Sequence, residues 1–207
     1  MELTVELVAR FVVVASALSL LVFGLSILAV ERLGHRSAPV ERETGPVALV
    51  NYVGILGFVA VGLVSGVTMI GTIPAPSGPI YPAIVVVGIV LLVAAGFLAV
   101  WGYLSLGRQF ASDAEVRPDT VLVTNGAFGL VRHPMYLAVL LLWAGSALAL
   151  VSPLMALCFV VLFPAFVARS RAEERLLTRH FGSAYDAYAA RVPMLMPGWP
   201  GHALTGH

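Results

Sequence analysis

Long uncharged stretches dominate the chain, and they are long enough to predict membrane-spanning helices. Residues 11–30 contain no charged side chain, and residues 44–107 contain no Asp, Glu, Lys, Arg or His. About 20 residues of helix, at a rise of about 1.5 Å each, cross the roughly 30 Å of hydrocarbon in a bilayer. The second stretch is too long for one helix, and the proline-rich turn at 73–82 divides it. The pattern therefore predicts helices over 11–30, roughly 47–72 and 82–106.

A third uncharged run, residues 137–168, is broken at Ser152-Pro153, which leaves two arms of about fifteen residues each. Such arms are short for full spans, so we expect a tight helical hairpin whose arms extend beyond the uncharged run at both ends. The expected fold is an all-α integral membrane protein with five transmembrane helices, the last two forming this hairpin, and a cytoplasmic C-terminal helical segment. Residues 1–106 would frame the site and residues 107–207 would carry it, within one structural domain overall.

The distribution of arginine predicts how these helices are oriented. The chain has twelve arginines and no lysine, and eleven of the arginines fall in residues 31–46, 107–133 and 169–207, whereas only Arg10 falls near the other face. Loops rich in basic residues stay on the cytoplasmic side of a membrane. We therefore expect a multi-pass protein of the inner or plasma membrane, with its N-terminus outside and its C-terminus and active site in the cytoplasm.

Composition supports a membrane protein and excludes several other classes. Hydrophobic residues make up 59% of the chain and charged residues 11%, and the mean hydropathy is +0.96, far from a soluble domain. The net charge of +1 provides no basic surface for nucleic acid. The single cysteine, Cys158, and the irregular spacing of the histidines predict that no metal is bound. Glu2 and Glu6, with no basic segment, precede the first apolar stretch, so we expect a retained helix rather than a signal peptide.

The segment that leads into the fourth expected helix holds the first candidate cluster. Residues 124–126 (Thr-Asn-Gly) have turn composition, and Pro134 suits the first turn of a helix, where its missing N–H has no partner. Arg132 and His133 come just before this helix start, whose exposed amides could bind an anion such as a carboxylate. The alternative is an interfacial anchor, in which the arginine contacts lipid headgroups and Tyr136 lies among interfacial aromatic residues.

The second candidate cluster lies in residues 168–193, after the fifth expected helix. Arg169 and Glu173 are four positions apart and so share a helix face. Glu174 can pair with Arg171, which would leave Glu173 to bind an amine or ribose hydroxyls. The alternative is a solvated charged helix with ordinary ion pairs. Because the hairpin joins the two clusters, we expect them to lie close together at one membrane face.

Together the two segments resemble a known family. The ordered pair "LVTNGAFGLVRHPMY" and "EERLLTRHFGSAYDAYAARVP", separated by a short hairpin, is similar to the isoprenylcysteine carboxyl methyltransferase family in its compact prokaryotic membrane form. The match runs from Gly107 to Pro197, and membrane phospholipid N-methyltransferases and thiol S-methyltransferases share much of it. The resemblance implies S-adenosylmethionine as methyl donor, with S-adenosylhomocysteine as product, bound at the cytoplasmic end of the last two helices.

The resemblance also implies roles for individual residues. It places cofactor-binding residues at Leu122, Val123, Gly126, Phe128, His133, Pro134, Tyr136, Glu173 and Glu174. It implies catalytic roles for His133, Glu173 and Arg169, the last of which would contact a substrate carboxylate. Arg132 is expected to be a supporting residue only.

We therefore expect a methyltransferase whose partners are the lipid bilayer and a lipophilic acceptor. Carboxyl O-methylation of an isoprenylcysteine-like substrate is the reaction that the resemblance favours. A carboxylate acceptor is already ionised, whereas an amine or a thiol needs a base, for which His133 and Glu173 are the first candidates. The alternatives are phospholipid N-methylation, small-thiol S-methylation, and a non-catalytic membrane scaffold.

Overall fold

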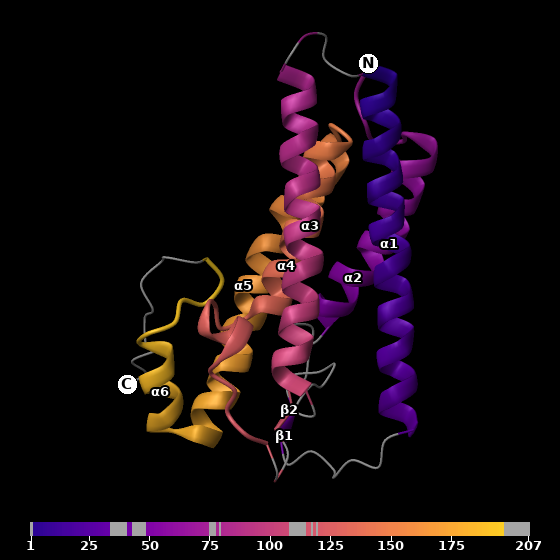
Figure 1. Ribbon diagram of the computed structural model, residues 1–207. Coiled ribbons are helices and arrows are strands. Elements are labelled where there is room, and N and C mark those ends of the chain that lie inside the picture. The colour runs from indigo at the N-terminus through magenta and orange to yellow at the C-terminus, as the bar shows by residue number, and fades with distance from the viewer. Residues whose placement is uncertain are drawn as a thin grey trace. The chain divides into compact units, whose positions relative to one another are not determined.

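The computed structural model of the protein describes residues 2–33, 41–42, 49–74, 78, 80–107, 115–116, 118 and 120–196. The helices in this part of the chain are α1 (Glu2–Leu33), α2 (Val50–Thr68), α3 (Ile80–Leu106), the 3-10 turn η3 (Gly126–Gly129), α4 (Pro134–Ala149), α5 (Pro153–Phe181) and α6 (Ser183–Ala189) (Figure 1). Two short strands, β1 (Glu41–Arg42) and β2 (Glu115–Val116), pair antiparallel with Glu41 opposite Val116.

The chain forms two compact units. Unit 1 consists of Met1–Gly34, Asn51–Phe97 and Ala138–Pro164, and unit 2 consists of His35–Val50, Leu98–Leu137 and Ala165–His207. Helices α3, α4 and α5 therefore contribute residues to both units, as does α2 through its first residue, Val50. The predicted division at residue 106 into a framing part and a functional part stays a prediction.

Four helices in the described part of the chain are long and apolar enough to cross a membrane. They are the segment Leu3–Val22 of α1, and α2, α3 and α5. The expected all-α membrane protein is thereby confirmed. Helix α4 is apolar but has 16 residues, which gives a length of about 24 Å, shorter than the hydrocarbon layer. The fifth span and the orientation of the termini stay predictions.

Helix α1 extends further toward the N-terminus than the uncharged run predicted. Glu6 and Arg10 lie in its first part, where Nη1 of the arginine is 3.8 Å from Oε1 of the glutamate. Opposite charges four positions apart support a helix rather than end it. The uncharged run therefore underestimated the length of α1, whereas α2 and α3 match their predicted ranges within a few residues.

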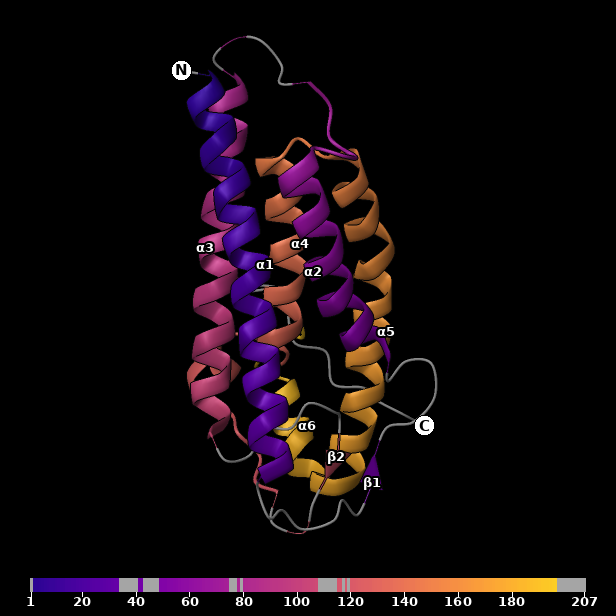
Figure 2. The ribbon, with the colours of Figure 1, turned by 90° about the vertical axis from the view of Figure 1, so that its right-hand side faces the viewer.

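In unit 1, glycines allow helix backbones to approach closely. A Cβ atom on Gly88 of α3 would lie 2.5 Å from the amide nitrogen of Ala149 and 2.7 Å from the carbonyl oxygen of Gly145, both on α4. A Cβ atom on Gly66 of α2 would lie 2.7 Å from a methyl group of Val14 on α1, and Figure 2 shows these two helices side by side. Membrane helices gain packing through small residues at such contacts.

The core of unit 1 includes a buried tryptophan on α4. The indole Nε1 of Trp143 donates a hydrogen bond of 3.0 Å to the carbonyl oxygen of Gly54 on α2. Its ring packs edge-on against Phe58, with the ring centroids 5.5 Å apart. An indole N–H that is buried in this way needs a partner, so Trp143 fixes α2 against α4.

The predicted hairpin break at Ser152-Pro153 is confirmed. Helix α4 ends at Ala149 and α5 begins at Pro153. The backbone N–H of Ser152 donates to the carbonyl oxygen of Ala147 at 2.8 Å, and the hydroxyl of the same serine accepts from the backbone N–H of Met155 at 3.2 Å. The serine therefore caps the start of α5.

Helix α5 continues beyond the uncharged run, as expected, and ends at Phe181. Gly182 follows with φ of 54°, in the left-handed region that glycine adopts with little strain. The helix therefore breaks at this glycine, and α6 begins immediately after it.

Candidate functional site

The two motif segments meet in unit 2, where the start of α4 lies beside the second half of α5 (Figure 1). Six side chains form one connected network, which we call the α4–α5 cluster: Arg132, His133, Tyr136, Arg169, Glu173 and Glu174. The expected convergence of the two segments is therefore observed.

The buried end of the α4–α5 cluster is a charge pair between Arg132 and Glu174. The arginine Nε donates to Oε1 of the glutamate at 2.6 Å, and the two side chains are 4% and 2% exposed. Nε2 of His133 lies 3.2 Å from the same carboxylate oxygen. A carboxylate that has lost its water requires such partners. The carboxylate of Glu174 therefore already has two hydrogen-bond partners within the protein, Arg132 and His133.

The prediction that Glu174 pairs with Arg171 is wrong. Arg171 is exposed, whereas Glu174 is buried. Three positions along a helix fall about 60° short of a full turn, so the two side chains do not point in the same direction. The face that carries Glu174 packs against Arg132 and His133 instead.

Arg132 also holds the end of α6. Its Nη1 donates to the carbonyl oxygens of Ala189, at 2.6 Å, and Val192, at 2.8 Å. Its backbone N–H donates to the carbonyl oxygen of Pro193 at 2.8 Å. Carbonyls at a helix end lack partners within the helix, and a guanidinium satisfies them. The alternative in which Arg132 contacts lipid headgroups is excluded, because protein groups surround its side chain.

Tyr136 links the other members of the α4–α5 cluster. Its hydroxyl donates to Oε2 of Glu173 at 2.7 Å and accepts from Nε of Arg169 at 3.1 Å. The His133 ring stacks on the tyrosine ring, with centroids 5.4 Å apart and planes within 4°, and its Nδ1 lies 3.7 Å from Oε2 of Glu173. Tyr136 is buried, so the interfacial position considered for it is excluded as well.

The two carboxylates of the α4–α5 cluster differ in exposure. The side chain of Glu173 is 26% exposed, whereas that of Glu174 is 2% exposed. A carboxylate that keeps an accessible oxygen can accept hydrogen bonds from a ligand in addition to those from the protein. Glu173 is therefore the acidic group of the cluster that a ligand can reach.

The predicted turn before the α4–α5 cluster is confirmed, and α3 holds it in place. Gly126 begins η3 with φ of 58°. A Cβ atom on this glycine would collide with the hydroxyl of Ser105 on α3, and that hydroxyl accepts a hydrogen bond of 3.1 Å from the backbone N–H of Ala127. Both the backbone angle and the contact therefore require glycine.

Replacing Gly126 by alanine is expected to lower the free energy of unfolding by about 1–3 kcal/mol, because the backbone is left-handed and the new methyl group displaces Ser105. Thermal unfolding in detergent measures the change. Gly129→Ala is the matched control in the same turn, since its Cβ atom would meet only the carbonyl oxygen of Thr124, at 3.5 Å. Equal melting temperatures for the two variants would contradict this account.

The other predicted site residues lie on the adjoining loop and helix start. Pro134 begins α4 directly after His133, as predicted. Leu122 packs against the two tyrosines of α6. Val123 and Phe128 are half-buried. The structure thus joins five of the predicted residues with Arg132 in one network and leaves the remaining ones outside it.

Two tyrosines of α6 belong to this region and were not predicted as site residues. The hydroxyl of Tyr188 donates to the carbonyl oxygen of Phe128 at 2.7 Å. The hydroxyl of Tyr185 is buried and has no hydrogen-bond partner among the described residues. Burial raises the pKa of both tyrosines, so both keep their protons at neutral pH. Their spacing of three indicated a shared helix face but not what that face contacts.

The fold and the site define an integral membrane protein with a ligand-accessible carboxylate in an otherwise buried ion-pair network. The family model of phospholipid methyltransferases matches residues 83–184, which include the whole α4–α5 cluster. Through this region the chain is similar to the membrane methyltransferases that this model describes, and the relatives below confirm the resemblance to isoprenylcysteine methyltransferases.

The chain is 32% identical over 113 residues to protein-S-isoprenylcysteine O-methyltransferase B of Arabidopsis thaliana, covering 53% of this chain and 57% of that protein. It is 32% identical over 111 residues to protein-S-isoprenylcysteine O-methyltransferase of Schizosaccharomyces pombe, covering 46% and 47%. It is also 34% identical over 112 residues to the cobalt-zinc-cadmium resistance protein CzcN of Cupriavidus metallidurans, covering 52% and 50%. The chain thus spans about half the length of these relatives.

Proposed function

We propose that the protein is a membrane-embedded, S-adenosylmethionine-dependent methyltransferase that methylates the carboxyl group of a lipophilic, isoprenylcysteine-like acceptor at the cytoplasmic face. One observation carries the proposal: a single tyrosine hydroxyl joins the accessible carboxylate of Glu173 to the buried guanidinium of Arg169, one helical turn away. This arrangement offers one acidic and one basic group for two ligands of opposite charge. The family match supports the same reaction class.

Two buried hydroxyls of unit 2 support the fit of the cofactor. Ser170 and Tyr185 each have a buried hydroxyl without a hydrogen-bond partner among the described residues. Buried polar groups normally have a partner, and a polar ligand can supply it. S-adenosylmethionine carries amino, carboxylate and hydroxyl groups, which match these hydroxyls and Glu173. When bound, it supplies a methyl group on a positively charged sulfur.

Glu173 would bind the amino group or the ribose hydroxyls of the cofactor. The residues proposed to border the rest of it are Leu122, Val123, Gly126, Phe128, His133, Pro134 and Tyr136. We assign Glu174 a positioning role, because Arg132 and His133 already engage its carboxylate. Through these contacts Glu174 keeps the imidazole and the end of α6 in place.

Arg169 would hold the acceptor carboxylate. Guanidinium groups bind carboxylates through strong, charge-assisted hydrogen bonds, and burial strengthens them. Because Tyr136 accepts from Arg169 and donates to Glu173, it fixes the orientation of both side chains. Methyl transfer to an ionised carboxylate needs alignment of the reactants more than proton transfer. An amine acceptor would instead require a base, and His133 between the two carboxylates is the group available for it.

A methyl-transfer assay with radiolabelled S-adenosylmethionine tests this proposal. Farnesyl-cysteine analogues, total lipid extract and small thiols are offered in parallel, and the products are treated with alkali. A carboxyl methyl ester releases volatile methanol, whereas N-methyl and S-methyl products keep the label. Alkali-labile label in the farnesyl-cysteine arm is the expected result. Stable label in lipid or thiol would establish the corresponding alternative, and no transfer together with no binding of S-adenosylhomocysteine would indicate a non-catalytic scaffold.

Replacing Arg169 by alanine is expected to leave the affinity for S-adenosylhomocysteine within about threefold of wild type and to lower turnover by about 100-fold or more, because the acceptor loses its charge-assisted contact. Binding is measured by calorimetry and turnover by the assay above. Arg169→Lys keeps the charge but loses the planar guanidinium, and should retain intermediate activity. A large loss of cofactor affinity in Arg169→Ala, with turnover at saturating cofactor unchanged, would contradict this assignment.

A further inference from the structure

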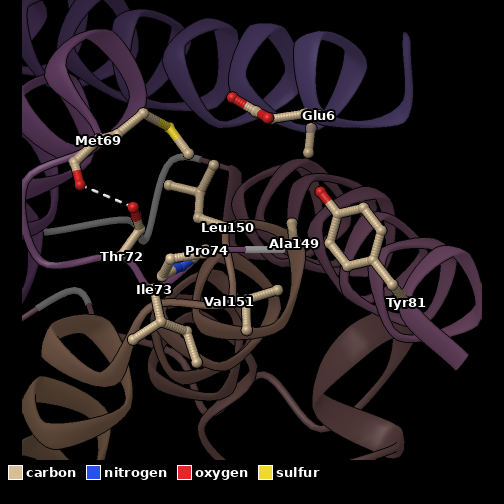
Figure 3. A pocket seen from close by; sticks show the side chains of 10 residues that line it. Glu6, Met69, Thr72, Ile73, Pro74, Tyr81, Ala149, Leu150 and Val151 are labelled. Carbon is tan, nitrogen blue, oxygen red and sulfur yellow. Dashed lines mark hydrogen bonds between the residues drawn. The ribbon is translucent and has the colours of Figure 1, made fainter. Parts of the chain in front are cut away.

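Unit 1 contains a pocket of about 340 Å³ that has no part in the proposed methyl transfer. It lies between α1, α3 and two turns, and Figure 3 shows Glu6 on α1 above the turn that carries Leu150, with the Tyr81 ring beside it. The residues that line it include Glu6, Ala9, Met69 and Tyr81, together with residues 72–74 and 149–151. The second turn joins α4 to α5, so the pocket adjoins the end of α4, whereas the α4–α5 cluster adjoins its start.

Hydrogen bonds between the two turns make the base of this pocket rigid. The backbone N–H of Ile73 donates to the carbonyl oxygen of Val151 at 3.2 Å. The hydroxyl of Ser152 donates to the carbonyl oxygen of Gly71 at 2.7 Å. Two lining residues have strained backbones, Met69 with φ of 61° and Val151 with φ of 46°. Left-handed backbone is unusual for a β-branched residue, and such strain occurs preferentially where a ligand is bound.

Among the described residues, the negative charge of the Glu6 carboxylate has only one distant cationic partner, Arg10. It lies within the candidate membrane span of α1, where an ionised group is a functional hypothesis by default. Its partner Arg10 approaches only to 3.8 Å, because Nε and Nη2 of that arginine donate to the carbonyl oxygens of Gly66 and Val67 at the end of α2, at 2.9 and 2.6 Å. The Glu6 side chain is 32% exposed, so a second cation can reach it from the pocket.

Exposed apolar side chains lie close in sequence to the residues that line the pocket. Leu3 and Leu7 on α1, Ile73 at the pocket and Ile80 at the start of α3 are 68%, 53%, 48% and 70% exposed. A cationic ligand that also covers these apolar side chains must carry hydrocarbon. A membrane lipid combines both properties.

We propose that this pocket binds the headgroup of a phospholipid that carries a protonated primary amine, with its acyl chains along the exposed leucines and isoleucines. A primary ammonium offers three donors to Glu6 and neighbouring oxygens. A quaternary ammonium would have no donor for the carboxylate. Among the described residues that line the pocket, Tyr81 is the one aromatic side chain, so these residues do not form the usual aromatic cage. A headgroup without a cationic group would not provide the Glu6 carboxylate with a second cationic partner. This inference does not rest on the proposed function.

Native mass spectrometry of the full chain in detergent tests the assignment, with equimolar phosphatidylethanolamine, phosphatidylcholine and phosphatidylglycerol of identical acyl chains. The wild-type protein is expected to retain the ethanolamine lipid in excess over the other two. In Glu6→Gln this excess should fall about fivefold, the effect of losing one partly exposed charge-assisted contact. The control is Asp186→Asn, which removes a carboxylate from α6 and should keep the wild-type ratio.

A second pair of variants keeps the test valid if Glu6→Gln proves unstable. Ile73→Trp places a larger side chain at an exposed lining position and should reduce retention of the ethanolamine lipid while the glutamate remains. Leu104→Trp, on an exposed position of α3 outside the pocket, should have no effect. Equal retention of the three lipids by the wild type, or an unchanged ratio in both Glu6→Gln and Ile73→Trp, would overturn the proposal. Equally strong competition by water-soluble phosphoethanolamine would overturn its assignment to a lipid. Because no methyl donor is present, failure here leaves the proposed function unaffected.

Discussion

Glu173→Gln is expected to weaken the binding of S-adenosylhomocysteine by about 30- to 100-fold, which corresponds to the loss of one charge-assisted hydrogen bond. Glutamine has the shape of glutamate and can still accept the hydrogen bond from Tyr136, so the change removes mainly the negative charge. Glu173 is the carboxylate of the α4–α5 cluster that remains accessible, and the proposed contact is with a cationic or hydroxyl group of the cofactor. Isothermal titration calorimetry of the detergent-purified protein measures the affinity.

The melting temperature of Glu173→Gln should stay close to that of the wild type, because residue 173 is partly exposed and water can solvate the uncharged glutamine amide. Asp186→Asn provides a control for the general loss of an acidic group in unit 2 and should bind normally. His133→Ala is expected to reduce the affinity as well, since the imidazole stacks on Tyr136 and lies between both carboxylates. If Glu173→Gln and His133→Ala both bind with wild-type affinity, the cofactor does not occupy this cluster.

Arg132→Ala is expected to have the largest effect on stability, a loss of about 3–5 kcal/mol, because it leaves a buried carboxylate without its cation. The variant also leaves the carbonyl oxygens of Ala189 and Val192 without the donor that Arg132 provides. We expect a much lower melting temperature in detergent. Early proteolysis within the segment after α6 should accompany it, because that segment loses its attachment to the start of α4.

The matched control for Arg132→Ala is Arg171→Ala, which removes an exposed arginine from α5 and should change stability by less than about 0.5 kcal/mol. Removing both partners of a buried ion pair costs less than removing one. Arg132→Met combined with Glu174→Gln should therefore be more stable than Arg132→Met alone. A melting temperature for Arg132→Ala equal to that of Arg171→Ala would show that the pair does not hold α6.

The sequence predicted the structure best where the backbone preference of one or two residues determines whether a helix continues. Ser152-Pro153 cannot continue a helix without cost, and Gly182 can adopt a left-handed backbone, so both breaks were predictable. The approach of the two motif segments followed from the hairpin, because a short turn between two helices returns the chain to the same end. These rules act within a few residues and need no knowledge of distant contacts.

The partners of individual charges could not be predicted in the same way. Glu174 has Arg171 nearby in sequence but pairs with Arg132, which is 42 positions away. The choice depends on which face of α5 is buried. Charged residues lie on all sides of this part of the helix, so the sequence pattern does not identify that face. Likewise, the predicted span began at residue 11, where the uncharged run starts, yet Glu6 and Arg10 pair with each other within α1.

The close contact between α3 and α4 bears on how a lipophilic acceptor reaches the protein from the bilayer. Where Gly88 faces Gly145, a single methyl group would already collide with backbone atoms of α4. A prenyl or acyl chain is at least as wide as a methyl group, so it cannot pass through this seam of unit 1. At the level of Gly88 and Gly145, a lateral path for the acceptor proposed above therefore has to lie between another pair of helices.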